Sequence, residues 1–125
     1  MSFLNNNVYD SGLAWLVTNG TRIDITIGEA ATYAEAVTDA AKSAGNKTGI
    51  TIGAPGARTP TGRKVVVPQI TGGTVTQTDT ATHWAITDGA SVLVATGALS
   101  AGQAVTDGNT WQFTAAFDIG IPAPA

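Results

Sequence analysis

The stretch that decides the predicted fold is Trp111-Gln112-Phe113-Thr114-Ala115-Ala116-Phe117-Asp118-Ile119-Gly120-Ile121. Apolar residues occupy every odd position of this stretch, and its even positions are mostly small or polar. Because successive side chains of a β-strand point to opposite faces of the sheet, the alternation predicts one long core strand. We expect its large residues to pack on a second sheet or on helices.

Other strands are predicted in both halves of the chain. In Thr21–Ile27, three isoleucines alternate with Arg22, Asp24 and Thr26, which predicts a half-buried strand with a polar outer face. Threonines on alternate positions from Thr74 to Thr82 predict a ribbon that buries little. Further strands are expected at residues 48–52, 64–67 with Pro68 at an edge or strand end, and 83–87 paired as a hairpin with 92–95.

Two short helices are expected in the first third of the chain. Apolar residues at three- and four-residue spacing predict a helix from near Val8 to Asn19, with Asp10 as its cap. Thr32 and Glu35 have capping-box spacing, which predicts a second helix from Tyr33 towards Ala41. Tyr33 and Val37 would face inward, and Gly45-Asn46 would end this helix.

Together these patterns predict a mainly β protein, a β-sandwich or jelly-roll-like single domain over residues 1–125. We divide it into an N-terminal arm (1–7), an exposed loop (53–62) and a C-terminal tail (122–125). The candidate core consists of large apolar residues from the predicted helix and strands: Leu13, Leu16, Ile23, Ile25, Ile27, Trp84, Ile86, Trp111, Phe113, Phe117 and Ile119.

Composition excludes several kinds of chemistry. The chain of 125 residues has no cysteine and one histidine, so disulfides, thiolate zinc sites and iron–sulfur clusters are ruled out. His83 has no nucleophile motif beside it, and no ligand spacing indicates a metal, so we expect neither an enzyme nor a cofactor. The net charge of −3 argues against nucleic acid, and the absence of a basic leader or a long apolar run argues against secretion and a membrane.

Two groups of polar residues are candidate subunit contacts. Arg58, Arg63 and Lys64 lie in a turn-rich stretch that forms either a solvated loop or an arm pairing with acidic groups of a neighbouring subunit. Thr74, Thr76 and Thr78 form either a polar sheet edge or a strand that completes its hydrogen bonds with another chain.

Several motifs resemble a family of small virion structural proteins of tailed bacteriophages and prophages. They are Asn19–Asp24, Thr32-Tyr33 with Glu35-Ala36, Gly45–Thr48, Gly62–Val65, His83–Ala85, Ala95–Ser100 and Ala116–Pro122. The resemblance covers nearly the whole chain. It implies a head-decoration, cement or fibre-associated protein, made in the host cytoplasm and carried on the virion.

The first functional hypothesis is a capsid decoration or cement protein on the capsid surface. Its partners would be the major capsid protein and copies of itself, as a trimer or dimer. The alternative is an adhesin module of a tail or head fibre, in which Trp15, Trp84 or Trp111 stacks on sugar rings. The sequence disfavours the alternative, because the predicted positions of all three tryptophans place them in the core.

Overall fold

The computed structural model describes residues 6–122, with side chains from Asp10 onward. The chain is mainly β, with two sheets and a short N-terminal helix, which confirms the predicted fold class. Its elements are α1 (Asn6–Asn19), β1 (Arg22–Thr26), α2 (Tyr33–Val37), β2 (Ser43–Thr48), β3 (Gly56–Ala57), β4 (Arg63–Val67), β5 (Ile70–Val75), β6 (Asp79–Thr87), β7 (Leu93–Val105), β8 (Thr110–Phe113) and β9 (Phe117–Ile121).

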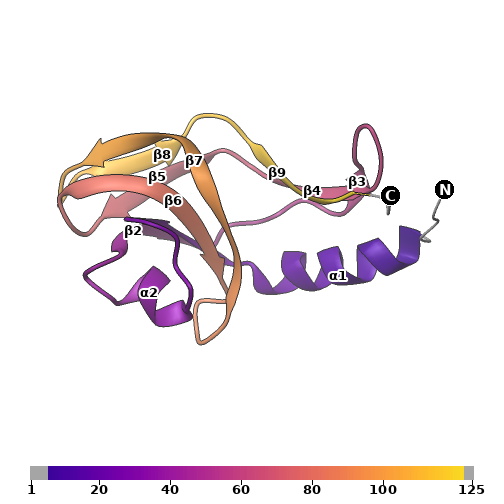
Figure 1. Cartoon of the computed structure of the whole chain (residues 1–125), viewed down its shortest axis with the longest axis horizontal. Coiled ribbons are helices and arrows are strands. Elements are labelled where there is room, and N and C mark those ends of the chain that lie inside the picture. The colour runs from indigo at the N-terminus through magenta and orange to yellow at the C-terminus, as the bar shows by residue number, and fades with distance from the viewer. Residues whose placement is uncertain (1–5, 123–125) are drawn as a thin grey trace.

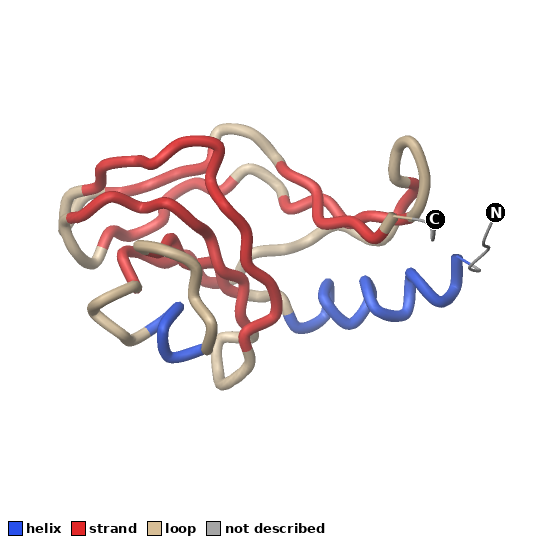
Figure 2. Tube along the Cα trace, viewed as in Figure 1, coloured by secondary structure: helices blue, strands red, loops and turns tan. Residues whose placement is uncertain are grey.

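The two sheets form two regions of the molecule (Figure 1). Six antiparallel strands in the order β7-β6-β1-β2-β5-β8 curl into a half-barrel, and β7 and β8 are its terminal strands. Three strands in the order β3-β4-β9 form the second sheet, and α1 packs against its central strand. We call this second region the helix-backed sheet. Figure 2 shows that loops cluster around the half-barrel, whereas the helix runs alongside the smaller sheet.

The predicted strand over residues 111–121 is wrong in one respect, because it is two strands. β8 closes one side of the half-barrel, and β9 pairs with β4 in the other sheet. The small exposed residues Thr114, Ala115 and Ala116 make the crossing between them. The apolar alternation continues through the crossing because Phe113 and Phe117 both pack on the same core. The chain therefore changes sheets without changing the side it buries.

β1 was expected to be half-buried, and that expectation is wrong. Asp24 and Thr26, on its predicted polar face, are fully buried. A second small core, Ala30, Ala36 and Ala85, lies between α2 and the strands. Since α2 and its flanking loops cover the outer face of the half-barrel there, β1 is buried on both faces.

The helices differ from prediction in their details. α1 is confirmed, but Asp10 lies inside it and does not cap it. Thr32 caps α2 by accepting a hydrogen bond from the Glu35 backbone N–H, as predicted. α2 ends at Val37, its fully buried residue is Ala36, and Tyr33 and Val37 are only partly buried. A five-residue helix on a curved sheet leaves room only for the small methyl group of alanine at the contact.

Two predicted strands are also placed differently. Gly45-Asn46 does not end a helix but lies within β2, which replaces the strand expected at 48–52. The threonine ribbon 74–82 is divided between β5 and β6, which are not neighbours in the sheet. The hairpin of β6 and β7 and the strand ending before Pro68 are confirmed.

The candidate core residues all lie in one cluster. Six are buried and five are partly buried around them. The fully buried valines of β4, Val65 and Val67, join this cluster and link the two regions. Of the three proposed segments, residues 1–5 of the arm and 123–125 of the tail lie outside the described residues, and 53–62 contains the short strand β3 paired with β4.

Both core tryptophans lie on glycines of a neighbouring strand. Trp84 is opposite Gly97, and a Cβ built on that glycine would lie 2.4 Å from the indole. Trp111 is opposite Gly73, and a Cβ there would lie 2.3 Å from the indole. The absence of a side chain at these glycines therefore makes room for the two largest residues of the half-barrel.

Candidate interaction surfaces

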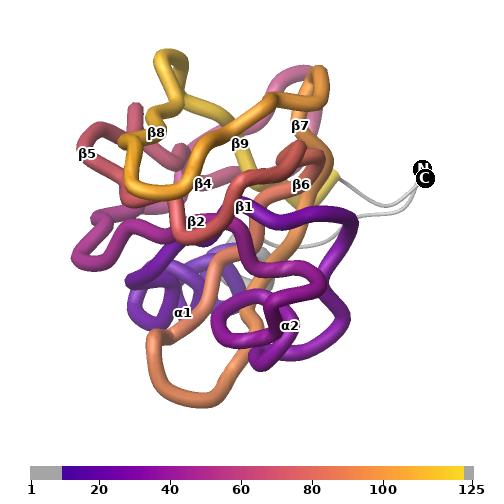
Figure 3. The backbone as a smooth tube through the Cα atoms, turned by 90° about the vertical axis from the view of Figure 1, so that its left-hand side faces the viewer, coloured from indigo at the N-terminus to yellow at the C-terminus, as the bar shows by residue number. Residues whose placement is uncertain are grey.

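A groove of about 630 Å³ lies where the half-barrel is open. Its walls come from β7 and from the segment that runs out of β8 into β9. β7, β8 and β9 all lie in the upper part of the view in Figure 3. The lining residues are Trp84, Gly97, Ala98, Leu99, Ser100, Ala101, Gln103, Gln112, Phe113, Thr114, Ala115, Ala116, Phe117 and Asp118. Asp118 is the only charged residue among them.

Aromatic rings form the floor of this groove. The ring centroid of Trp84 lies 4.8 Å from that of Phe117, and Phe117 lies 6.0 Å from Phe113 in an edge-to-face arrangement. Phe113 continues the contact to the buried Trp111 at 5.0 Å. Such tilted and edge-to-face pairs are favourable geometries for aromatic rings. Three rings from β6, β8 and β9 therefore hold the groove's floor in a fixed arrangement.

The outward side of α1 is the second candidate surface. Leu13 and Leu16 are buried against the core, whereas the exposed side from Asp10 onward carries Ser11, Gly12, Ala14, Trp15 and Thr18. None of these five residues is charged. Trp15 is 51% exposed, so its predicted place in the core is wrong. Leu13 and Leu16 are three positions apart and share one side of the helix. Trp15, which directly precedes Leu16, lies on the other side.

The three predicted basic contact residues do not form one free cluster. Arg63 donates two hydrogen bonds to the Asp10 carboxylate, at 2.9 and 3.2 Å, and so ties β4 to α1. Lys64 pairs with Asp118 on β9 at 2.8 Å. Arg58 donates to the carbonyl oxygen of Thr61, and together with Lys64 and Asp118 it lines a small polar pocket of about 400 Å³. Two of the three cations therefore already have partners within the chain.

The predicted threonine contacts lie apart from any open edge. Thr74 is on β5, which has β2 on one side and β8 on the other. The backbone N–H of Thr76 donates to the Ala44 carbonyl, and the Thr78 hydroxyl accepts from the Asp107 backbone N–H. The open strand edges of the half-barrel belong to β7 and β8, which the threonine pattern did not indicate.

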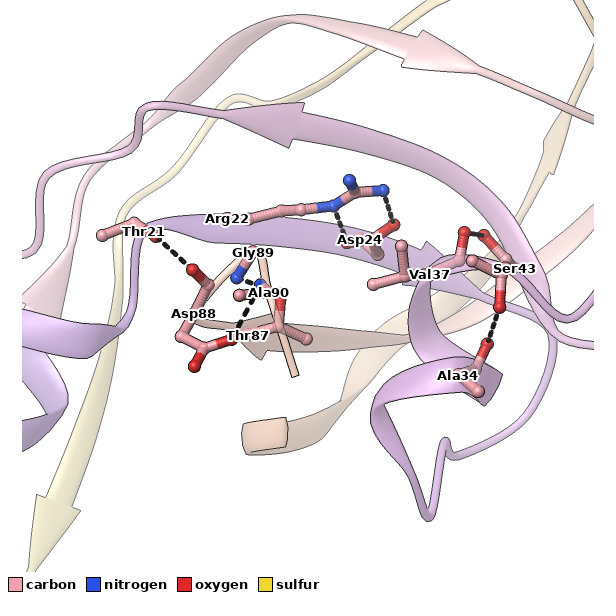
Figure 4. Close-up of polar contacts among 11 residues, drawn as sticks. Thr21, Arg22, Asp24, Ala34, Val37, Ser43, Thr87, Asp88, Gly89 and Ala90 are labelled. Carbon is pink, nitrogen blue, oxygen red and sulfur yellow. Dashed lines mark hydrogen bonds and ion pairs between the residues drawn. The ribbon is translucent and has the colours of Figure 1, made fainter. Parts of the chain in front are cut away.

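Figure 4 shows a buried ion pair and a stabilised turn beside α2. Arg22 donates hydrogen bonds to both carboxylate oxygens of Asp24, at 2.8 and 3.0 Å. Burial raises the pKa of Asp24, and the bonds from Arg22 lower it without cancelling that effect. In the turn after β6, the Asp88 carboxylate accepts backbone N–H bonds from residues 90–92, which lower its pKa. Both groups serve the fold, and neither opens into the groove.

Among residues 6–122, no group of three or more His, Cys, Asp or Glu side chains is placed to hold a metal ion. No helix in that range is long and apolar enough to cross a membrane.

Comparisons with family models, curated proteins and solved structures return no match for the chain. The fold and its surfaces are therefore interpreted from this molecule alone. Sequence reasoning missed the groove, although one signal was present: residues 93–105 contain no charged side chain, which is unusual for a strand at a sheet edge.

Proposed function

We propose that this chain is a non-enzymatic structural protein of a tailed-bacteriophage virion. It acts as a capsid decoration or cement protein that binds across major capsid protein subunits on the capsid surface and stabilises the head. It also associates with copies of itself. This proposal keeps the hypothesis that the sequence resemblance suggests and adds to it a surface on which docking would take place.

The exposed face of α1 is the observation that carries the proposal. A helix on a protein surface ordinarily has charged residues on its outward side, whereas this one has small uncharged residues around the half-exposed Trp15. Tryptophan is enriched at the centres of protein interfaces, and charged residues are depleted there. The face therefore suits burial against another protein, with Trp15 as the anchor.

A protein that binds the assembled shell but not the free capsid subunit stabilises the shell by mass action. That role needs complementary surfaces and no reactive side chain. The exposed α1 face and the groove are formed by different elements, so one copy has two places at which to contact its surroundings.

The test adds purified protein to emptied capsids of the phage that encodes it and measures occupancy by cryo-electron microscopy. Trp15→Ser should lower the affinity for the shell at least tenfold, as loss of a central aromatic contact does. Val92→Ser is the matched control, because Val92 is also an exposed large apolar residue but lies in the β6–β7 turn. Copies confined to the tail with none on the shell, or equal occupancy by the Trp15 variant, would contradict the proposal.

One observation favours the adhesin module as a second candidate. The exposed Trp15 ring is accessible to a sugar, which removes part of the sequence argument against this function. Trp111 is buried on Gly73 and gives it no support, whereas Trp84 packs on Gly97 but lines the groove. Titration with host surface glycans separates the candidates, because an adhesin binds them through Trp15 and leaves emptied capsids bare.

A further inference from the structure

The groove between β7 and the β8–β9 segment is bordered by unpaired main chain. In the described part of the chain, β7 pairs only with β6 and β8 pairs only with β5. Each terminal strand therefore leaves a row of backbone N–H and C=O groups without a strand partner on its outer side. The half-barrel is a sheet whose two open edges border the same groove.

The backbone of β7 diverges from its partner where it lines the groove. The register pairs Ala81 with Gln103 and His83 with Ala98, so four residues of β7 lie opposite a single residue of β6. Residues 99–102 thus have no Cα partner on β6, and three of them line the groove. A bulge of this kind re-aims the backbone of a strand, and here the bulged residues border the open side.

The edge also lacks the usual protection against pairing. Natural edge strands carry lysines, other charges or prolines that discourage a second strand from adding. β7 has thirteen residues, and none is charged or a proline. Its blunting features are two bulges against β6, at Val94 and at residues 99–102, and the second borders the groove. The β7 wall therefore presents no charged side chain, while its backbone offers hydrogen bonds.

We propose that the groove binds an extended, uncharged segment of another protein, which adds to β7 as a strand. The segment's backbone bonds to the open edge of β7 within residues 97–103, which would span about 23 Å if fully extended and which include the bulge at 99–102. Every second side chain points down onto the rings of Trp84, Phe113 and Phe117, so these side chains are apolar. The bound strand completes the open side of the half-barrel.

The occupant is a partner protein rather than a second copy of this chain. An inserted strand needs at least one free edge and no attached sheet that would collide with the walls. Within residues 6–122, each strand with a free edge (β3, β7, β8 and β9) is attached to a sheet on its other side, so a second copy's described residues provide no single strand that could insert between the two walls. The charge of the lining indicates the chemistry of the partner. Asp118 is the only charged residue in the lining, so the groove favours an uncharged segment.

This inference rests on the proposed function only for the identity of the partner, which would be a segment of the shell subunit. The direct test needs no virion. A capped, fluorescein-labelled peptide of seven alternating valines and threonines is titrated with the full chain, and fluorescence anisotropy is measured. We expect saturable binding below about 1 mM, the weak end of specific association.

Two variants on one strand give the matched comparison. Ala101 and Ala104 are both exposed alanines of β7, but only Ala101 lines the groove. Ala101→Asp should weaken peptide binding at least tenfold, and Ala104→Asp should leave it unchanged. A peptide with N-methylated valines keeps its apolar side chains but lacks the backbone N–H donors of those valines. Its affinity should also be at least tenfold lower. Amide hydrogen exchange at residues 97–103 should slow when the unmethylated peptide binds.

Three results would overturn the inference. They are no saturation by the valine–threonine peptide, equal affinity of the N-methylated peptide, and equal affinity of Ala101→Asp. Self-association that Ala101→Asp abolishes, without any peptide binding, would assign the groove to a second copy and likewise reject the proposed occupant. Peptide binding by a protein that never occupies capsids would keep the strand site and reject the proposed function. Full capsid occupancy by Ala101→Asp would reject the shell subunit as the source of the strand.

Discussion

The half-barrel and the helix-backed sheet are stabilised in different ways. The half-barrel contains an ion pair whose carboxylate, Asp24, is fully buried, and tryptophans that fit onto glycines without spare room. In the helix-backed sheet, one apolar seam between α1 and β4 is supplemented by partly exposed ion pairs. The difference teaches that the number of ion pairs does not set how much they stabilise a region, because burial decides what each pair contributes.

The comparison also separates the two candidate surfaces. The groove has walls held by a tightly packed core, so its shape is set before any partner binds. The exposed α1 face is convex and depends on one large side chain. We therefore expect substitutions in the groove to weaken binding by disturbing the pairing of a bound strand with the β7 backbone. Substitutions on the exposed α1 face should weaken binding by removing the contact that Trp15 makes.

The largest effect is expected at the buried ion pair. Arg22→Met leaves the fully buried Asp24 carboxylate without its partner, which should lower the free energy of unfolding by about 3–5 kcal/mol at neutral pH. The double variant Arg22→Met/Asp24→Asn removes the charge and should recover most of that loss. Urea denaturation at pH 7 measures both variants. A single variant as stable as the wild type would show that the pair contributes nothing.

The same variant has a predicted pH dependence. Burial raises the pKa of Asp24 in the folded protein, so the folded chain binds that proton more tightly than the unfolded chain. Asp24 therefore contributes less to stability as the pH rises from the unfolded pKa of about 3.9 through the folded value. Without Arg22 that pKa rises further, so the deficit of Arg22→Met relative to the wild type should shrink as the pH falls towards 4.

The second prediction tests the glycine packing of the half-barrel. Gly73→Ala places a methyl group 2.3 Å from Trp111 and should cost about 1–3 kcal/mol of overpacking. Gly73→Ala/Trp111→Phe should recover part of the loss, since the smaller ring leaves room for the methyl group. Thermal unfolding measures the series. If alanine is tolerated at position 73 with no loss, the close fit of indole and glycine does not contribute to stability.

The third prediction concerns a glycine of the helix-backed sheet. Gly12 lies in α1 with no atom within 4 Å of a Cβ built on it. Gly12→Ala should therefore stabilise the protein by about 1 kcal/mol, the difference in helix propensity. The same substitution thus has opposite signs in the two regions. Destabilisation at position 12 would show that the exposed α1 face is already packed against something in solution.

Much of this fold follows from local sequence patterns. Alternation located the core strands, and helical spacing located α1, because these periods report which side chains are buried. The change of sheet between Phe113 and Phe117 was not predictable, since alternation says which side faces a core but not which strand is the neighbour. The buried face of β1 was missed for a similar reason: polar Asp24 is stabilised there by Arg22, two residues away, and by α2, which covers it.

The candidate surfaces were harder to predict than the fold. The basic residues were singled out by composition, but pairing with Asp10 and Asp118 depends on segments more than fifty residues apart in sequence. Trp15 was assigned to the core from its type, whereas the phase of α1 around Leu13 and Leu16 places it outside. The groove requires knowing that β7 and β8 are terminal strands, which is a property of the whole topology.

The smallest effect is expected at the surface pair of the helix-backed sheet. Lys64 and Asp118 are 2.8 Å apart, but both side chains are substantially exposed, so Lys64→Ala should change the free energy of unfolding by about 0.5 kcal/mol or less. High salt screens such a pair, and the difference between variant and wild type should vanish in 1 M NaCl. Asp24, in contrast, is fully buried and the Arg22 side chain is only 17% exposed, so the penalty of Arg22→Met should persist in the same salt. A salt-insensitive Lys64 effect of several kcal/mol would remove the distinction between the two regions, because it would mean that burial is not what sets the strength of their ion pairs.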